Sequence, residues 1–292
     1  MTLPLFVQIG LRTSIPLTVI AIGLAAEPGD ATTLFRQPAR LLRSLLAMMV
    51  IVPTFAVIAA RGFELEPAVK IALGALSVSP VPPFWPNRVR KAGGDESYII
   101  GLLVATALLS VIIIPLALQV FEALFSIPLS ITPFAVAKIA FTTVLIPLVI
   151  GIGLARYAPR FAARSARPVA RLALIVLVAS VLPILFKSWS AITSLVGDGT
   201  LLTMLSLALA ALAAGHLLGG PDAEDRTVLA MACATRHPAI ALAIASTNFP
   251  HEKLVPAAIL LYVLVSAGAT TLYVMWSKRH PRHGHRPALA VR

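Results

Sequence analysis

The residues best able to do chemistry are Arg236 and His237, which stand in the run Thr235-Arg236-His237-Pro238. This run interrupts an apolar segment at about 226–249, close to its middle. Arginine stays charged at any workable pH, so Arg236 supplies a fixed cation that attracts an anion. Histidine titrates near neutral pH, so His237 can carry a proton. The alternative is structural: an arginine bonded to backbone carbonyls of the other interruption, at residues 79–87, and a buried histidine bonded to one carbonyl.

A second interruption lies at residues 79–87, where four prolines fall within seven residues. Proline removes a backbone donor and clashes with the preceding turn, so this stretch is not one helix. Within a membrane such backbone is tolerated only against protein or a wet cavity. We therefore predict that Pro82, Pro83 and Asn87 join Thr235–Pro238 in a substrate site. The alternative is that 79–87 is only the cytoplasmic end of a helix, because basic residues follow at 88–91.

Arg12 is a further candidate, about eight residues into the first apolar segment. It either lines a vestibule that attracts anions or extends to the membrane surface. Lys70 and Lys138 lie near predicted outer ends of helices, where extension to the surface is expected. No carboxylate lies at mid-membrane in any apolar segment. We therefore expect no metal site and no cofactor.

The composition is that of a membrane protein. The 292 residues are 58% hydrophobic and 12% charged, whereas soluble domains are about 25% charged. Apolar blocks of roughly 20 residues, each long enough to cross a bilayer, recur along the chain. We predict an all-α polytopic protein with about nine transmembrane helices. Their ranges are approximately 4–25, 42–61, 67–84, 97–121, 132–155, 168–187, 199–218, 226–249 and 254–276.

The basic residues indicate the orientation. Seventeen of the 24 Lys and Arg residues fall in alternate loops and the C-terminal tail, and three fall in the opposite loops. The positive-inside rule then places the C-terminus in the cytoplasm and the N-terminus outside, in the plasma (inner) membrane. Because these bases are dispersed among loops, we expect the lipid bilayer and no nucleic acid as a partner. The N-terminus lacks a signal-peptide pattern, so the first segment is expected to be retained.

The predicted spans form two groups of four with opposite topology, and the third member of each group is interrupted. Inverted repeats with broken helices at matching positions are typical of secondary transporters. We divide the chain into a first half at 1–131, with its broken helix at about 67–93, and a second half at 132–277, with its broken helix at about 226–249. A basic cytoplasmic tail follows at 278–292.

Catalytic motifs are absent: the sequence contains no HExxH, no GxSxG and no glycine-rich phosphate loop. At its two interruptions the chain instead resembles the bile acid:sodium symporter family. The run 231–245 followed by Asn248-Phe249 looks like that family's second crossover helix, and the segment from 67 to Gly93-Gly94-Asp95 looks like its first. The resemblance implies a core domain containing two crossing broken helices, a panel domain, and alternating access. One helix of the usual ten, the first, is missing.

The sequence departs from the family at the sodium ligands that the resemblance implies. The second crossover of the family reads Glu-x-Gly-x-Gln-Asn, which falls here on Ala232, Arg236 and His237. The Ser-Asn pair of the first crossover falls on Trp85 and Pro86, and a one-residue shift brings in Asn87 but no carboxylate. We therefore expect the sodium sites to be lost.

The sequence thus predicts a secondary carrier, and no enzyme, for a small organic anion, with a proton or no ion as the coupling partner. One alternative is an orthodox sodium-coupled symporter of a bile-acid-like anion, with ligands from carbonyls and hydroxyls. The other is a membrane sensor or scaffold that has kept a transporter fold.

Overall fold

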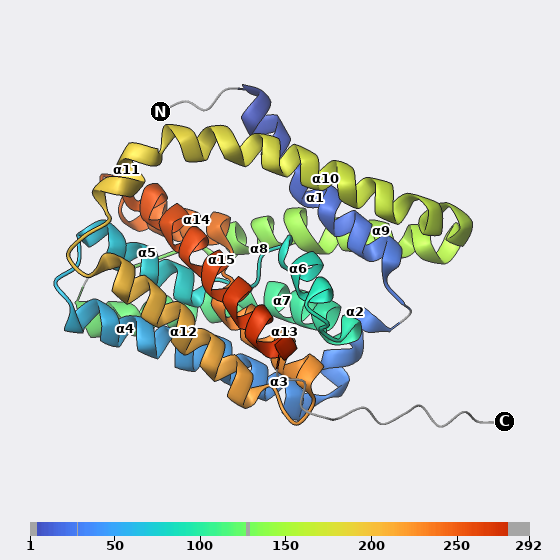
Figure 1. Ribbon diagram of the computed structural model, residues 1–292, viewed down its shortest axis with the longest axis horizontal. Helices are drawn as coiled ribbons and strands as arrows, with labels where there is room; N and C mark the ends of the chain where they lie inside the picture. The colour runs from blue at the N-terminus through green and yellow to red at the C-terminus, as the bar shows by residue number, and fades with distance from the viewer. Residues whose placement is uncertain (1–4, 28, 127–128, 280–292) are drawn as a thin grey trace.

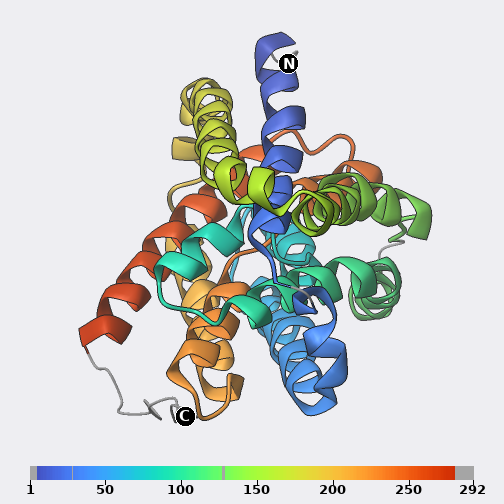
Figure 2. The same cartoon turned by 90° about the vertical axis from the view of Figure 1, so that its right-hand side faces the viewer.

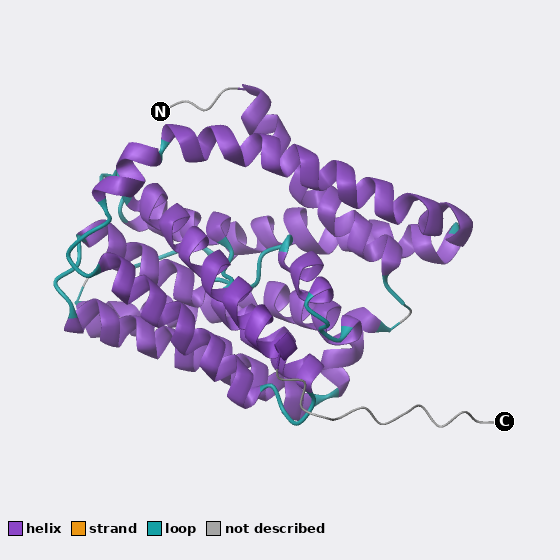
Figure 3. Cartoon of the chain, viewed as in Figure 1, coloured by secondary structure: helices purple, strands orange, loops and turns teal. Residues whose placement is uncertain are grey.

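The computed structural model describes residues 5–27, 29–126 and 129–279. Within these residues the chain is helical and contains no strand (Figure 3). The helices of the first half are α1 (Leu5–Ala25), α2 (Asp30–Thr33), α3 (Pro38–Leu45), α4 (Val52–Gly62), α5 (Pro67–Val78), α6 (Trp85–Lys91) and α7 (Glu96–Phe125). Those of the second half are α8 (Pro133–Ala140), α9 (Ile146–Tyr157), α10 (Pro159–Lys187), α11 (Trp189–Ser194), α12 (Thr200–Leu218), α13 (Ala223–Ala234), α14 (Pro238–Asn248) and α15 (Val255–Arg279).

Seven helical segments of the described residues are long and apolar enough to cross a membrane. Their ranges are 38–62, 96–125, 133–157, 159–187, 200–218, 223–248 and 255–279. The prediction of a multi-pass helical membrane protein is therefore confirmed. The other two predicted spans fall on shorter apolar helices, Arg12–Ala25 and Pro67–Val78, so a total of nine spans stays a prediction.

Two of the long segments are continuous only through a π-helical turn. α3 passes through Leu46–Ile51 into α4, and α8 passes through Phe141–Leu145 into α9. In each, a proline follows directly on the first residue of the next helix, at Pro53 and Pro147. Such turns leave a backbone carbonyl without its usual partner, because a proline cannot donate to it.

α1, α9 and α10 pack against one another and form a group of their own beside the remaining helices (Figures 1 and 2). Gly23 of α1 and Gly151 of α9 bring two of these helix backbones close together. A Cβ atom added at Gly151 would lie 2.4 Å from the Ile20 carbonyl oxygen, and one at Gly23 would lie 2.7 Å from that of Leu148. Only glycine permits this approach of the two backbones.

The main hydrophobic core lies among α3–α7 and α12–α15, and a smaller cluster joins α1 and α9 to α7. By contrast, α10 is the most exposed of the seven long segments, with only 11% of its apolar stretch buried. Its exposed side chains include Leu172, Ile175 and Phe186. An apolar surface of this extent fits contact with lipid.

The helix segments that carry most Arg and Lys residues lie at one end of the molecule, on the right in Figure 1, which we call the basic end. They are α3, α6, the first turns of α10 and the last turn of α15. Arg40 of α3 pairs there with Asp225 of α13 and lies 3.6 Å from Asp95, before α7. Lys278 donates to the carbonyl of Lys91 at 3.3 Å. One detail of the prediction is wrong: most of the basic residues assigned to loops on this side lie on helices, among them those of α3, those of α6 and those on the first turns of α10. The predicted tail beyond residue 279 lies outside the described residues.

Candidate functional site

The first interruption separates α5 from α6. Residues 79–84 leave the helix, with Ser79 extended at φ −74° and ψ 145°. Pro82 and Pro83 cannot donate to the carbonyls at the end of α5, so the helix ends at Val78. Ser79, Val81, Pro82 and Pro83 are all buried. This segment therefore lies inside the protein and is not a helix end at the surface.

The second interruption separates α13 from α14. Thr235 and His237 are extended, with ψ of 115° and 103°. Helical geometry is unfavourable for His237 because it precedes a proline, whereas Pro238 itself is favourable in the first turn of a new helix. The run Thr235–His237 is thus a short extended link between two half-helices, as its sequence predicts.

The two interruptions touch, and together they form what we call the junction: residues 79–84 and 235–237. The His237 amide donates to the Pro80 carbonyl at 2.9 Å. Nη1 of Arg236 donates to the Ser79 carbonyl at 3.1 Å. Residues 157 positions apart in sequence are therefore joined by backbone and side-chain hydrogen bonds.

Arg236 is almost wholly buried, with 2% of its surface exposed. Its Nη2 donates to the Met48 carbonyl at 2.9 Å. That carbonyl is free because the amide of Val52 bonds instead to Ala47, and Pro53 has no amide hydrogen. The π-helical turn at Leu46–Ile51 therefore supplies an acceptor for the arginine.

The guanidinium has no carboxylate partner among the described residues. Its Nε is buried and makes no hydrogen bond there. The nearby groups are neutral: Cys233 is a buried free thiol, and the Tyr262 hydroxyl donates to the Ala234 carbonyl at 3.1 Å. Three backbone carbonyls at the ends of α5 and α13 and in the π-helical turn are thus satisfied by side chains. The arginine has the structural contacts that the sequence analysis gave as its alternative role.

His237 is equally buried, but its ring does not use the carbonyl that the alternative interpretation expected. The backbone amide makes that bond, while both ring nitrogens are buried without a partner in the described residues. Trp85 is the first residue of α6, and its indole nitrogen is also buried without a hydrogen-bond partner in the described residues. Unpartnered buried polar atoms are uncommon and call for a functional or structural reason.

The remaining predicted site residues divide into two sets. Thr235, Pro82 and Pro83 are buried in or beside the junction, and Pro238 and Asn87 lie next to it, half-buried. Arg12 is exposed on α1, which packs on α9 and α10 and makes few contacts elsewhere. The structure therefore brings the two interruptions together through Arg236 and His237 and leaves Arg12 apart from them.

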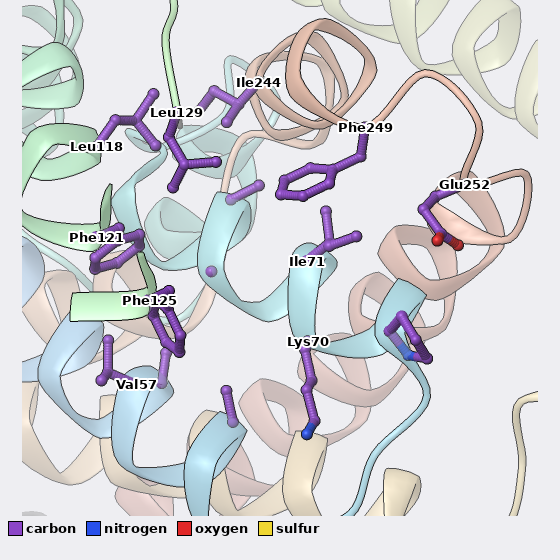
Figure 4. Close-up of a pocket in the computed structure, with 15 residues that line it drawn as sticks. Val57, Lys70, Ile71, Leu118, Phe121, Phe125, Leu129, Ile244, Phe249 and Glu252 are labelled. Atoms are coloured by element: carbon purple, nitrogen blue, oxygen red, sulfur yellow. The ribbon is translucent and has the colours of Figure 1, made fainter. Parts of the chain in front are cut away.

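A cavity of about 300 Å³ lies away from the junction, at the end where α4 turns into α5 (Figure 4). Apolar side chains of α4, α5, α7 and α14 line it, with Lys70 and Glu252 as its charged residues. This cavity could not be predicted from the sequence, because its lining is apolar and comes from four helices and two adjoining loops. Lys70 is the one signal in the sequence, and its position near the end of a predicted helix favours extension to the membrane surface instead.

Residues 14–195 match the Sodium Bile acid symporter family. The chain belongs to this family. No curated protein matches it. The predicted resemblance to bile acid:sodium symporters is therefore confirmed, and the family is one of transporters, which agrees with the expectation that the chain is not an enzyme.

The match to the symporter family includes the first interruption and ends before α12. The second interruption, with Arg236 and His237, lies beyond the matched residues. The half of the junction that carries the charged side chains is thus the half outside the family match.

Proposed function

We propose that this chain is a secondary active transporter of a small organic anion that works by alternating access without a bound sodium ion. The observation that carries the proposal is the guanidinium of Arg236 between the carbonyls of Ser79 and Met48. A cation that belongs to the chain already occupies the junction.

The electrostatics of the junction explain why this excludes a mobile cation. The carbonyl ends of helices carry partial negative charge and attract cations. At the ends of α5 and α13 these carbonyls already accept from Arg236 and Tyr262. Neither interruption contains a carboxylate that could add negative charge. A sodium ion would therefore meet a fixed positive charge and few free oxygens.

The same charges favour an anionic substrate. Arg236 has no carboxylate partner among the described residues, so its charge is not cancelled locally. The N-terminal end of α14 adds partial positive charge beside it. The proposed substrate site uses Thr235, His237, Pro238 and Asn87 around this positive region, with Pro82 and Pro83 as its wall. In this proposal Arg12 acts separately, as an attractive charge on α1.

The two helix groups supply the moving parts in the proposed cycle. α1, α9 and α10 correspond to the panel domain, and the helices that hold the junction correspond to the core domain. Movement of one against the other would open the boundary between them to alternate sides. We propose an N-terminus outside and a C-terminus in the cytoplasm of the inner membrane, in keeping with the basic end described above.

The test begins with purified protein, because binding to the native state raises apparent stability by mass action. Thermal unfolding would be followed against a panel of small organic anions, in sodium chloride and in choline chloride. Any stabilising anion would then be used for uptake into proteoliposomes. We expect stabilisation and uptake that do not depend on sodium, and a steep sodium dependence would refute the proposal.

Two other functions give different results in the same test. A sodium-coupled carrier, which family membership alone favours, would be stabilised by an anion only in sodium chloride. A sensor or scaffold would take up no anion, whereas a carrier would take one up and would lose its anion response on Arg236→Ala; a loss of stability in that variant is expected in either case.

A further inference from the structure

The cavity at the α4–α5 end is bordered by only one of the two helix groups. Its lining comes from α4, α5, α7, α14 and two adjoining loops, and none of its residues belongs to α1, α9 or α10. A site that is emptied by movement of one group against the other must lie at their boundary. This cavity does not, so a molecule in it would stay with the core helices throughout a transport cycle.

The lining of the cavity is apolar and partly aromatic. Phe121 and Phe125 of α7 form one wall, with their rings edge to face at a centroid distance of 6.3 Å (Figure 4). Ile71 of α5 and Phe249, after α14, contribute further apolar surface. A volume of about 300 Å³ is at the small end of the range for ligand pockets. Such a space suits one aliphatic chain.

Small side chains keep the space open, and Gly74 is the clearest case. Its helical backbone does not require glycine, and the nearest atom to an added Cβ is Phe121 Cε2 at 3.7 Å. A side chain is thus sterically allowed at position 74, but a large one would extend into the cavity. Ala75 of α5 and Ala56 and Ala60 of α4 add to this opening.

Lys70 supplies the charge. It lies one turn before Gly74 on α5, is half-buried, and makes no ion pair with any described residue. The other charged lining residue, Glu252, comes from a separate loop and lies apart from Lys70 in Figure 4. A lysine beside an apolar space complements a molecule with an apolar chain and an anionic head.

We propose that this cavity is an accessory site for the aliphatic chain of a single-chain carboxylate amphiphile, with its carboxylate at Lys70. The chain would fill the space between Phe121, Phe249 and Gly74. Because α5 and α14 both lead to the junction, an occupant would hold these two half-helices against α4 and α7. The site is separate from the proposed transport path, so it stands or falls independently of the transported substrate.

The test uses thermal unfolding of the purified full-length protein with decanoate as the probe. Decyltrimethylammonium, which has the same chain and the opposite charge, is the matched control ligand. We expect decanoate to stabilise the wild type and decyltrimethylammonium to have little effect. Lys70→Met should weaken the apparent affinity for decanoate about tenfold or more, and Gly74→Phe should abolish the response.

Two variants control for the substitutions themselves. Lys138→Met removes a lysine outside the cavity, and Gly153→Phe adds a ring on α9 where a Cβ meets no atom within 4 Å. Both should respond to decanoate like the wild type. Should Gly74→Phe fail to fold, Gly74→Val serves as the milder filling variant. The proposal would be overturned if decanoate stabilised the filling variant at Gly74 as much as the wild type. It would also be overturned if the two amphiphiles stabilised the wild type equally.

The source of the amphiphile is resolved by mass spectrometry of lipids that co-purify with wild-type and Gly74→Phe protein. A free fatty acid lost from the variant supports the proposed carboxylate ligand, whereas a lost phospholipid would overturn the assignment of a single-chain carboxylate. Arg236→Gln separates this site from the proposed function, because it should alter the junction and leave the decanoate response unchanged.

Discussion

At the scale of single residues, Arg236 links three parts of the chain through one side chain. Its two terminal nitrogens donate to carbonyls of residues 79 and 48, and it belongs to the link between α13 and α14. Removing the arginine would leave both carbonyls buried and unsatisfied, at a cost of about 1–3 kcal/mol each. The oxygen atoms of these two carbonyls would then be available to coordinate a free cation.

The first prediction follows from this exchange of a tethered cation for a free one. Wild-type protein should unfold at the same temperature in sodium chloride and choline chloride. Arg236→Gln should be destabilised in choline chloride, by about 1–3 kcal/mol per lost carbonyl partner, and partly recovered by sodium. Thermal unfolding in the two salts measures this, and a sodium response in the wild type would contradict it.

The neighbouring residue should behave in the opposite way. The His237 ring has two buried nitrogens without a partner among the residues that the structure describes, and replacing such a group by an apolar one of similar size is close to neutral or stabilising. His237→Leu should therefore keep or raise the unfolding temperature, while Arg236→Leu lowers it. A large loss of stability in His237→Leu would mean that the ring has a partner after all, and a changed pH dependence of uptake would reveal the predicted proton role.

At the scale of elements, the π-helical turn before α4 determines where Arg236 can bond. Pro53 is essential, because an amide at that position could donate to the Met48 carbonyl. The turn before α9 is a natural comparison. It has the same proline spacing at Pro147, and no arginine of the described residues donates to the corresponding Thr142 carbonyl.

A third prediction uses this pair of turns. Replacing a helix proline usually stabilises, since proline costs a helix about 3 kcal/mol. Pro147→Ala should follow that rule. Pro53→Ala should gain less or lose stability, because its new amide competes with Arg236 for the Met48 carbonyl. Thermal unfolding of both variants gives the comparison, and an equal gain in each would show that the Met48 bond contributes little.

The two interruptions could be predicted from sequence because proline acts locally on its own turn. The meeting of the two interruptions is also predicted, but the hydrogen bond from Arg236 to the Ser79 carbonyl could be predicted only as an alternative, since it joins residues far apart in the chain. The Met48 acceptor could not be predicted, because a π-helical turn and a regular helix share the same apolar pattern. The cavity was missed for the same reason, as Gly74, Phe121 and Phe249 each read as ordinary membrane-helix residues.

At the scale of the whole molecule, the basic end is closed by charged contacts between α3, α7 and α13. Arg40 pairs with Asp225, lies near Asp95 and stacks on the Tyr98 ring at 3.9 Å. Cys233 lies eight residues along α13 from Asp225, roughly 12 Å deeper, and is completely buried. It is the only cysteine of the chain, so thiol labelling of the native protein reports one position.

A fourth prediction concerns opening of the protein at this basic end. Arg40→Gln should speed labelling of Cys233 by an impermeant maleimide several-fold, because a partly buried ion pair contributes about 1 kcal/mol to closure. The control is Arg90→Gln, whose partner Glu96 is six residues away and joins no distant helices. Labelling should come from the basic side only, and equal rates in the two variants would rule out Arg40 as the closing contact.

A cation built into the chain also has a consequence for the driving force. A carrier that holds Arg236 in its core domain moves that charge through part of the membrane field whenever the domain moves. The field is worth about 2.3 kcal/mol per elementary charge per 100 mV. With a monovalent anion bound the moving unit is neutral, and when empty it is positive. Membrane voltage would then act on the return of the empty carrier, which makes the resting potential itself the source of asymmetry between import and export.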